Sequence, residues 1–291
     1  MQKEKKGFAD TYQWLWEKYG GYQTSAEGGQ GQRTETKDHA RLLDAPPSKA
    51  WRGLEEVLTY YQSIFQKNQK AQEYLKSRGL TNPEIYEQFR IGYSDGSMPK
   101  QKELIPQLQD RGVLGEKGGE VFFECVIFPV EDTDKNLTGI YGRRVSEKAH
   151  RYLKGDHKGV FNARVFKAYQ KIYLTEGIID ALSLYQVGIR EAVALFGTNG
   201  LTDDHLTYMR DNMTKEVVLC LDNDDAGREA SKRISEKLSR ELGIISSQLQ
   251  LPDDIKDMNE WLLKGMTKEL IVKNIQQIPF EKQREKDYVL T

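Results

Sequence analysis

The chain has 291 residues, of which 30% are charged, and its formal net charge is only −1. This length suffices for one to three domains, and the near-zero charge excludes nucleic-acid binding through overall basicity, so such binding requires a local patch. Both cysteines lie in apolar runs, and no apolar stretch has the length of a signal peptide core or a membrane span. We therefore expect a cytoplasmic protein with no disulfide framework, no zinc and no membrane contact.

The first two segments of the chain differ in composition. Residues 1–48 are expected to form a short helix followed by a mobile linker that is rich in Gly, Gln, Ser and Thr. Beyond residue 49 the pattern becomes helical, because Leu54, Leu58 and Tyr61 recur at three- and four-residue intervals. Another helix is expected to begin at Asn82, since Asn is a good capping residue and a proline follows it.

A strand pair is expected next, at 121–130 and 137–145, because both segments are rich in β-branched and aromatic residues and the turn sequence EDTDKN separates them. Basic and aromatic residues follow closely. Arg binds phosphate oxygens and Tyr stacks on bases, although a solvated hairpin face is the simpler alternative. Residues 49–165 are thus expected to form a mixed α+β basic subdomain. Its candidate DNA- or NTP-binding residues are Arg143, Arg144, Arg151, Tyr152 and Lys154.

From residue 166 to residue 265 the apolar strands alternate with helical stretches. This alternation is typical of an α/β domain in which helices flank a parallel sheet. The expected four-stranded parallel sheet consists of strands at 171–175, 191–195, 216–221 and 246–251. The remaining residues, 266–291, are expected to form a C-terminal helical tail.

Acidic residues follow three of these four strands. Because the carboxyl ends of parallel strands lie at one edge of a sheet, these side chains should meet in one site. Oxygen-only ligands suit Mg²⁺ or Mn²⁺, and a pair of such ions is a standard device for moving a nucleotidyl group. A single acid at a strand end can also be a turn residue or a helix cap. The candidate catalytic residues are Glu176, Asp222 and Asp224; Asp257 and Asp180 complete the metal-ligand set, and Glu260 lies near them.

Several motifs resemble those of known families. EGIID (176–180), GTNG (197–200) and DNDDAG (222–227) are similar to the motifs of the TOPRIM domain, which primases, topoisomerases and certain nucleases share. The segments before and after this domain resemble the catalytic core of the DnaG-type DNA primases. These segments are YLKSRGL (74–80), VIFPVEDTDKNLTGIYGRRV (126–145), RYLKG (151–155) and LPDDIKDMNEWL (251–262).

The resemblance implies a primase core that joins ribonucleoside triphosphates into short RNA primers on a single-stranded DNA template. It also implies a two-metal site holding Mg²⁺ or Mn²⁺. Two alternatives remain open: a TOPRIM nuclease or topoisomerase-like fragment, and a catalytically silent DNA-binding replication accessory. The upstream basic segment favours primase over the first of these.

The chain departs from the family pattern at three places. Asn259 stands where the family has a carboxylate, Asn162 and Ala163 occupy a usually basic position, and Tyr141 precedes Gly142 in place of a glycine. We also expect no counterpart of the family's zinc-binding and helicase-binding domains in this chain. We therefore expect either an isolated core or a reduced relative of the kind found on mobile elements. Its expected partner is a separate zinc-binding protein or a replicative helicase.

Overall fold

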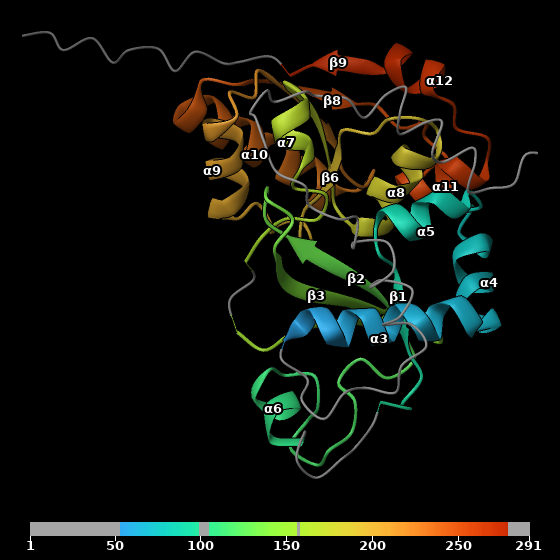
Figure 1. Ribbon diagram of the computed structural model, residues 1–291. Coiled ribbons are helices and arrows are strands. Elements are labelled where there is room, and N and C mark those ends of the chain that lie inside the picture. Colours follow the sequence, from blue (N-terminus) through green and yellow to red (C-terminus); the bar gives the residue numbers. More distant parts are fainter. Residues whose placement is uncertain (1–52, 99–104, 156–157, 279–291) are drawn as a thin grey trace, which may run out of the picture. The chain divides into compact units, whose positions relative to one another are not determined.

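The computed structural model describes residues 53–98, 105–155 and 158–278, which belong to one compact unit (Figure 1). The predicted N-terminal helix and linker, residues 1–48, lie outside the described residues. The first part of the described chain contains α3 (Leu54–Lys67), α4 (Gln69–Ser77), α5 (Pro83–Gln88), β1 (Gly92–Ser94), α6 (Ile105–Asp110), β2 (Cys125–Glu131), β3 (Leu137–Arg144) and β4 (His150–Tyr152).

The predicted helices of this part are present. α3 buries Leu58, Tyr61 and Phe65 on one face, as their spacing predicts. α5 begins as expected, because the Asn82 side chain accepts a hydrogen bond from the backbone N–H of Glu84 and Pro83 is the first helical residue. The apolar face of α3 packs on β1, β2 and β3, whereas α5 contacts α8 (Ile178–Gln186) of the second part.

Strands β1 to β4 form an antiparallel sheet in the order β1-β2-β3-β4. The predicted hairpin of β2 and β3 is present, but β2 begins at Cys125 rather than at residue 121. The reason is a turn over the preceding residues, where Glu124 adopts a φ of 58° and its N–H donates to the Ser94 carbonyl. In the β3–β4 pairing, Arg143 lies opposite His150 and Tyr141 lies opposite Tyr152.

The second part of the chain contains a mainly parallel sheet in the order β6-β5-β7-β8-β9. The four predicted strands are present and parallel to one another. The elements of this part are α7 (Val165–Ala168), β5 (Lys171–Thr175), α8 (Ile178–Gln186), β6 (Ala192–Ala194), α9 (Asp203–Asp211), β7 (Glu216–Cys220), α10 (Asp225–Leu242), β8 (Ile245–Leu249), α11 (Met258–Leu263), α12 (Lys268–Lys273) and β9 (Ile275–Gln277).

The fifth strand, β9, corrects the expected four-stranded sheet and the expected helical tail at 266–291. In the described part of that tail, residues 266–278, only α12 is helical, and β9 then pairs antiparallel with β8, with Ile275 opposite Leu249. The pairing satisfies backbone groups along the outer edge of β8, which would otherwise be exposed. A three-residue strand is too short to show a two-residue period in the sequence.

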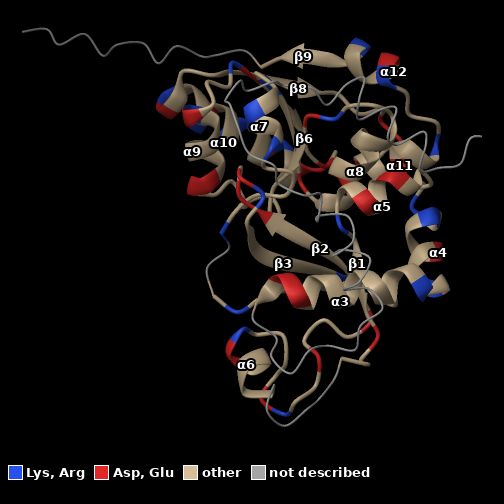
Figure 2. Cartoon of the chain, viewed as in Figure 1, with Lys and Arg blue, Asp and Glu red and all other residues tan. Residues whose placement is uncertain are grey.

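One hydrophobic cluster joins the two parts of the described chain. Phe89, which follows α5, stacks on Phe161 with ring centroids 5.0 Å apart, and it meets Tyr185 of α8 edge-on at 4.9 Å. Such contacts fix the antiparallel sheet against the parallel one. Acidic and basic residues are interspersed over both parts rather than gathered on one basic face (Figure 2). Within the described ranges, no helix combines the length and apolarity needed to cross a bilayer.

Candidate active site

The predicted acidic residues meet at the carboxyl edge of the parallel sheet. β5 and β7 are neighbours, with Thr175 opposite Cys220, so Glu176 and Asp222 leave the sheet side by side. Asp180 lies in the first turn of α8, and Asp257 directly precedes α11. The structure therefore brings together side chains that are up to 81 residues apart in the sequence.

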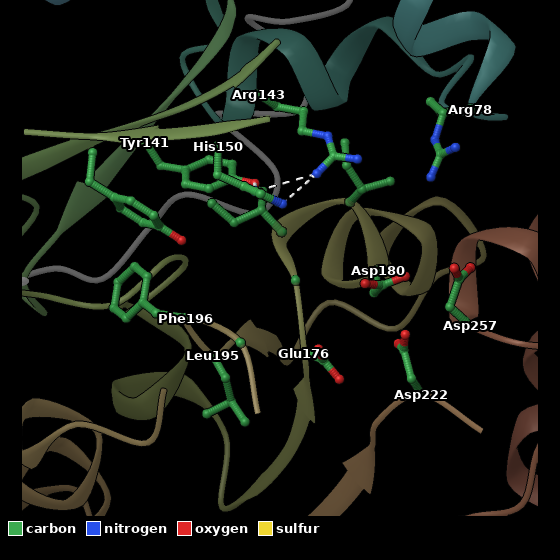
Figure 3. A pocket seen from close by; sticks show the side chains of 15 residues that line it. Arg78, Tyr141, Arg143, His150, Glu176, Asp180, Leu195, Phe196, Asp222 and Asp257 are labelled. Atoms are coloured by element: carbon green, nitrogen blue, oxygen red, sulfur yellow. Dashed lines mark hydrogen bonds between the residues drawn. The ribbon is translucent and has the colours of Figure 1, made fainter. Parts of the chain in front are cut away.

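These carboxylates line a cavity of about 380 Å³. Glu176, Asp180, Asp222 and Asp257 lie on one side of it, and the guanidinium groups of Arg78 and Arg143 lie across from them (Figure 3). The remaining residues that line this carboxylate cavity are Tyr141, His150, Tyr152, Gly177, Ile178, Ile179, Leu195, Phe196 and Gly197. The cavity thus has an acidic wall from the parallel-sheet part and a basic, aromatic wall from the antiparallel-sheet part.

The turn after β7 explains the small residues in DNDDAG. A Cβ atom on Gly227 would lie 2.1 Å from the Asp222 carbonyl oxygen, so only glycine permits this close approach of α10 to the turn. Asn223 fixes the other side of the turn, because its backbone N–H donates to the Lys256 carbonyl at 2.7 Å. The chain around Asp222 is therefore held by sterics and by hydrogen bonding.

Two of the predicted metal ligands also cap helices. Asp224 accepts a hydrogen bond from the Gly227 N–H at 2.9 Å at the start of α10, and Asp257 accepts one from the Glu260 N–H at 2.7 Å at the start of α11. Asp257 lines the carboxylate cavity, whereas Asp224 does not. Glu260 is turned to Lys264, which lies 3.2 Å away. Each capping carboxylate keeps further lone pairs, since a carboxylate has about four acceptor positions.

Burial and mutual repulsion raise the pKa values of three carboxyl groups in the acidic wall. Burial, and then the charges of Asp257 and Asp222, raise the pKa of Asp180 to about 7. Burial, followed by the charges of Asp222 and Asp224, raises the pKa of Glu176. The pKa of Asp222 is also raised, mainly by burial. A bound cation would reverse these effects, because it stabilises the ionised form of each carboxyl group.

The donor chemistry of this wall fits a hard divalent cation. Carboxylate oxygens are the ligands that Mg²⁺ and Mn²⁺ prefer, and the histidine that lines the cavity, His150, lies beside Arg143 rather than among the carboxylates. Among the described residues, no three His, Cys, Asp or Glu side chains are already gathered as the ligands of one ion. The four cavity-lining carboxylates are therefore suited to cations by charge and by type, and their side chains would have to converge on binding.

The predicted basic residues separate into two groups. Arg143 and Tyr152 line the carboxylate cavity. Arg144 is instead paired with Glu147 at 2.7 Å, and Arg151 donates to the His150 carbonyl at 2.9 Å. Lys154 lines two other cavities, one of them beside α6. The structure thus brings two of the five candidates to the acidic site.

Three further residues line the cavity and are not among the candidate site residues from the sequence: Arg78, Tyr141 and His150. Arg78 follows α4, and its Nε is buried without a hydrogen-bond partner among the described residues. His150 lies opposite Arg143 in the register of β3 and β4. The alternation of side chains along strands would have placed Tyr141, Arg143, His150 and Tyr152 on one face once the pairing was known.

The two asparagines that depart from the family pattern have structural roles. Asn259 is buried, and its Nδ2 donates to the Arg78 carbonyl at 2.7 Å and to Ser183 Oγ at 2.9 Å. Asn162 has a φ of 64°, and its Nδ2 donates to the Ala192 carbonyl at 2.8 Å. Neither asparagine lines the carboxylate cavity. Each of them connects helices or loops to the parallel-sheet part.

Comparison with known proteins agrees with this architecture. Residues 59–171 match the model of the DNA primase catalytic core, N-terminal domain, and residues 173–262 match that of a Toprim-like domain. A DNA primase from Aquifex aeolicus is 31% identical over 221 residues, which cover 67% of this chain and 44% of that protein.

Solved structures share the fold. The catalytic core of Escherichia coli primase superposes with a TM-score of 0.62 at 26% identity, over 76% of this chain and 78% of that one. A DnaG primase catalytic domain bound to single-stranded DNA gives a TM-score of 0.64 at 23% identity, over 83% and 84% of the two chains.

The fold and the acidic site define a Toprim-containing protein. Because a primase N-terminal domain precedes the Toprim-like domain, the chain belongs to the DnaG-type primase family and contains that family's catalytic core. The chain spans less than half the length of the curated relatives it matches.

Proposed function

We propose that this chain synthesises short RNA primers by joining ribonucleoside triphosphates on a single-stranded DNA template. The observation that carries the proposal is the cavity in which four carboxylates of the Toprim-like domain face Arg143 of the primase N-terminal domain. Nucleotidyl transfer needs both charges in one place, because anions must hold metal ions while cations bind phosphate oxygens. The relatives named as DNA primases support this function over that of a nuclease or topoisomerase.

Each wall of the cavity has its own task in this proposal. Glu176 and Asp222 would hold Mg²⁺ or Mn²⁺, with Asp180 and Asp257 as further oxygen donors and Asp224 adding charge beside them. Such ions, when bound, activate the primer 3′-hydroxyl and neutralise the triphosphate. Arg143 would bind phosphate oxygens from the opposite wall. The protein mostly positions and neutralises, since phosphoryl-type transfer asks little covalent chemistry of it.

The template is expected to run along the antiparallel-sheet part. Tyr152 would stack on a base near the cavity, while Arg144, Arg151 and Lys154 would contact the backbone of the strand farther away. A related DnaG catalytic domain has been solved with single-stranded DNA, which supports this substrate.

We also propose that the chain acts in the cytoplasm with a separate zinc-binding protein or a replicative helicase. Its proposed parts are an N-terminal segment (1–48), the basic subdomain (49–165), the TOPRIM domain (166–265) and a tail (266–291).

The proposal is tested by incubating the chain with single-stranded DNA and labelled ribonucleoside triphosphates, with Mg²⁺ or Mn²⁺ or with EDTA. Short labelled RNA should form only with the metal ion. Asp222→Asn should abolish it, whereas Asp225→Asn should not, because the Asp225 side chain is 96% exposed and paired with Arg228. Metal-dependent cleavage of the DNA without RNA synthesis would contradict the proposal and indicate a nuclease.

A further inference from the structure

Arg143 is held at the rim of the carboxylate cavity by a neighbouring histidine. Its NH1 group lies 2.6 Å from His150 Nε2, and His150 Nδ1 in turn forms a short hydrogen bond with the Tyr141 hydroxyl. Arg143 and His150 lie directly opposite each other in the β3–β4 pairing, so the register of the sheet brings their side chains together. All three side chains line the cavity (Figure 3).

The chemistry of the pair fixes the state of the imidazole. An arginine guanidinium has only N–H donors and stays protonated, so His150 Nε2 must accept and cannot carry a hydrogen. A neutral imidazole then carries its proton on Nδ1, which donates to the Tyr141 hydroxyl oxygen. Protonation of Nε2 would place a second N–H, and a second positive charge, against Arg143. The contact therefore exists only with neutral His150.

The charges around this pair leave Arg143 free for a ligand. No carboxylate forms an ion pair with Arg143 in the described part of the chain, and its Nε is buried without a hydrogen-bond partner there. The neighbouring Arg144 differs, because Glu147 neutralises it. An arginine that contacts a neutral acceptor keeps its full charge for an anion, whereas a salt-bridged arginine must first give up its carboxylate partner.

We infer that His150 is a positioning residue, which in its neutral form orients Arg143 to bind phosphate oxygens opposite the carboxylate wall. This inference rests on the proposed function and specifies how its basic wall is arranged. The phosphate belongs either to the incoming ribonucleoside triphosphate or to the template strand. Acidification should release Arg143 and weaken phosphate binding.

The groups around His150 favour its neutral form at neutral pH, and this is the form that accepts from Arg143. They are Tyr141 and Arg143 on β3 and Arg151 on β4 itself, whose NH1 donates to the His150 carbonyl. Burial of the ring, and then the Arg143 charge, lower the pKa of His150, although the side chain remains accessible at the rim. His150 is thus neutral at pH 7.5 and accessible to protons from solvent.

The first test measures the protonation state of the His150 imidazole directly and does not depend on catalytic activity. Nitrogen NMR of the ¹⁵N-labelled full chain can follow its four histidines, with His150→Gln identifying the signal by its loss. The expected result is a bare Nε2 with the proton on Nδ1, and a protonation midpoint that rises in Arg143→Ala. A proton on Nε2, or a midpoint unchanged in Arg143→Ala, would overturn the inference whatever the protein catalyses.

The second test measures binding of GTP with Ca²⁺ and, separately, of a single-stranded oligodeoxynucleotide. At pH 7.5, His150→Ala should weaken one of these two probes several-fold, and the affected probe identifies the phosphate. The ratio of wild-type to His150→Ala affinity should approach one as the pH falls through the protonation midpoint of His150 that the NMR titration gives. His150→Gln, whose amide can accept from Arg143 and donate to Tyr141, should retain most of the affinity.

Two comparisons separate positioning from a general structural effect. In the Arg143→Ala background, His150→Ala should have no additional effect on binding, because the group that it positions is gone. Arg240→Ala should leave GTP binding unchanged, because the Arg240 side chain is 74% exposed, lies beside Glu241 and does not line the cavity. Equal losses from His150→Ala with and without Arg143 would overturn the inference. If the wild-type chain binds neither probe while the NMR result holds, the proposed function fails rather than the histidine–arginine contact.

Discussion

Lys256 Nζ lies 3.4 Å from Asp222 Oδ2, so an ammonium group stands beside the acidic wall of the carboxylate cavity. The Lys256 backbone is held on both sides, because its N–H donates to Glu260 Oε2 at 2.8 Å and its carbonyl accepts from Asn223. The charge of Lys256 also acts to lower the pKa of Glu176 and Asp222. Lys256 therefore offsets part of the repulsion among the carboxylates when no metal ion is bound.

Lys256→Met should tighten the binding of divalent cations, because a competing positive charge is removed from Asp222. The Lys256 side chain is 61% exposed, so solvent screens the pair. Exposed ion pairs contribute roughly 0.2–1 kcal/mol, which predicts a gain of about 1.4- to fivefold in Mn²⁺ affinity. Isothermal titration of the purified chain measures it.

Lys264→Met is the matched control for this measurement. Lys264 forms ion pairs with Asp254 and Glu260, neither of which lines the carboxylate cavity, so its loss should leave the Mn²⁺ affinity unchanged. Weaker Mn²⁺ binding by Lys256→Met would show that Lys256 supports the metal site rather than competing with it.

Asp222 and Asp224 should respond differently to substitution, although both belong to the same motif. Asp222→Asn should reduce primer synthesis at least about 100-fold, as expected when a metal ligand is lost, and leave the metal-free protein as stable as before or more so. Asp224→Ala should in addition cost about 0.5–2 kcal/mol in the free energy of unfolding, because its side chain caps α10. Urea denaturation and the primer assay measure the two effects.

Asp224→Asn distinguishes the cap of α10 from the metal-binding role. Asn is as good a helix cap as Asp, so the stability should return while the negative charge stays absent. Synthesis by Asp224→Asn at the wild-type rate would show that Asp224 acts only as a cap.

The stability of the metal-free protein should depend on Asp180. Its pKa is about 7 in the folded chain, against an ordinary value of about 3.9 when unfolded. A raised pKa means that the folded state holds the proton longer, so this contribution to stability is full below pH 4 and falls as the pH rises through 7. In EDTA, Asp180→Asn should therefore be more stable than wild type at pH 8, by on the order of 1–3 kcal/mol, and similar at pH 4.

The difference in stability between wild type and Asp180→Asn separates the contribution of Asp180 from that of His205, which also changes with pH. Burial lowers the pKa of His205 to about 4, so its contribution has the opposite sign and is lost as the pH falls from 6.5 through 4. Both proteins contain His205, and it cancels in the comparison. Mg²⁺ should restore wild-type stability at pH 8 more than at pH 5.5. A difference between wild type and Asp180→Asn that does not change with pH would disprove the assignment.

The sequence predicted the acidic wall better than the basic wall, for a physical reason. Parallel strands all end at one edge, so acids that follow them must meet, and Glu176 and Asp222 do. Basic residues on an antiparallel hairpin alternate between two faces instead. Arg143 and Arg144 are adjacent in the sequence, and for that reason only Arg143 reaches the carboxylate cavity. His150 could be found only from the register of β3 and β4, which short strands do not reveal.

The fold was predictable where the pattern was long and regular. The alternation of strands and helices gave the four parallel strands, whereas β9 has only three residues and was expected to be helical. Asn259 stands at a sequence position where the family has a carboxylate. Its burial against Ser183 depends on the packing of α11 on α8, which no local pattern encodes.

Gly227→Ala tests the geometry of the acidic turn without touching a charge. In an ordinary helix this change would stabilise the protein by roughly 1 kcal/mol, because alanine is the better helix former. Here the new Cβ would meet the Asp222 carbonyl at 2.1 Å, and backbone cannot move aside as a side-chain end can. We expect a lower melting temperature together with weaker Mn²⁺ binding, since Asp222 must shift. Gly119→Ala is the control, because a Cβ there meets no atom within 4 Å. If Gly227→Ala binds Mn²⁺ and melts like the wild type, the turn is looser than the structure shows and Asp222 is not held in place by it.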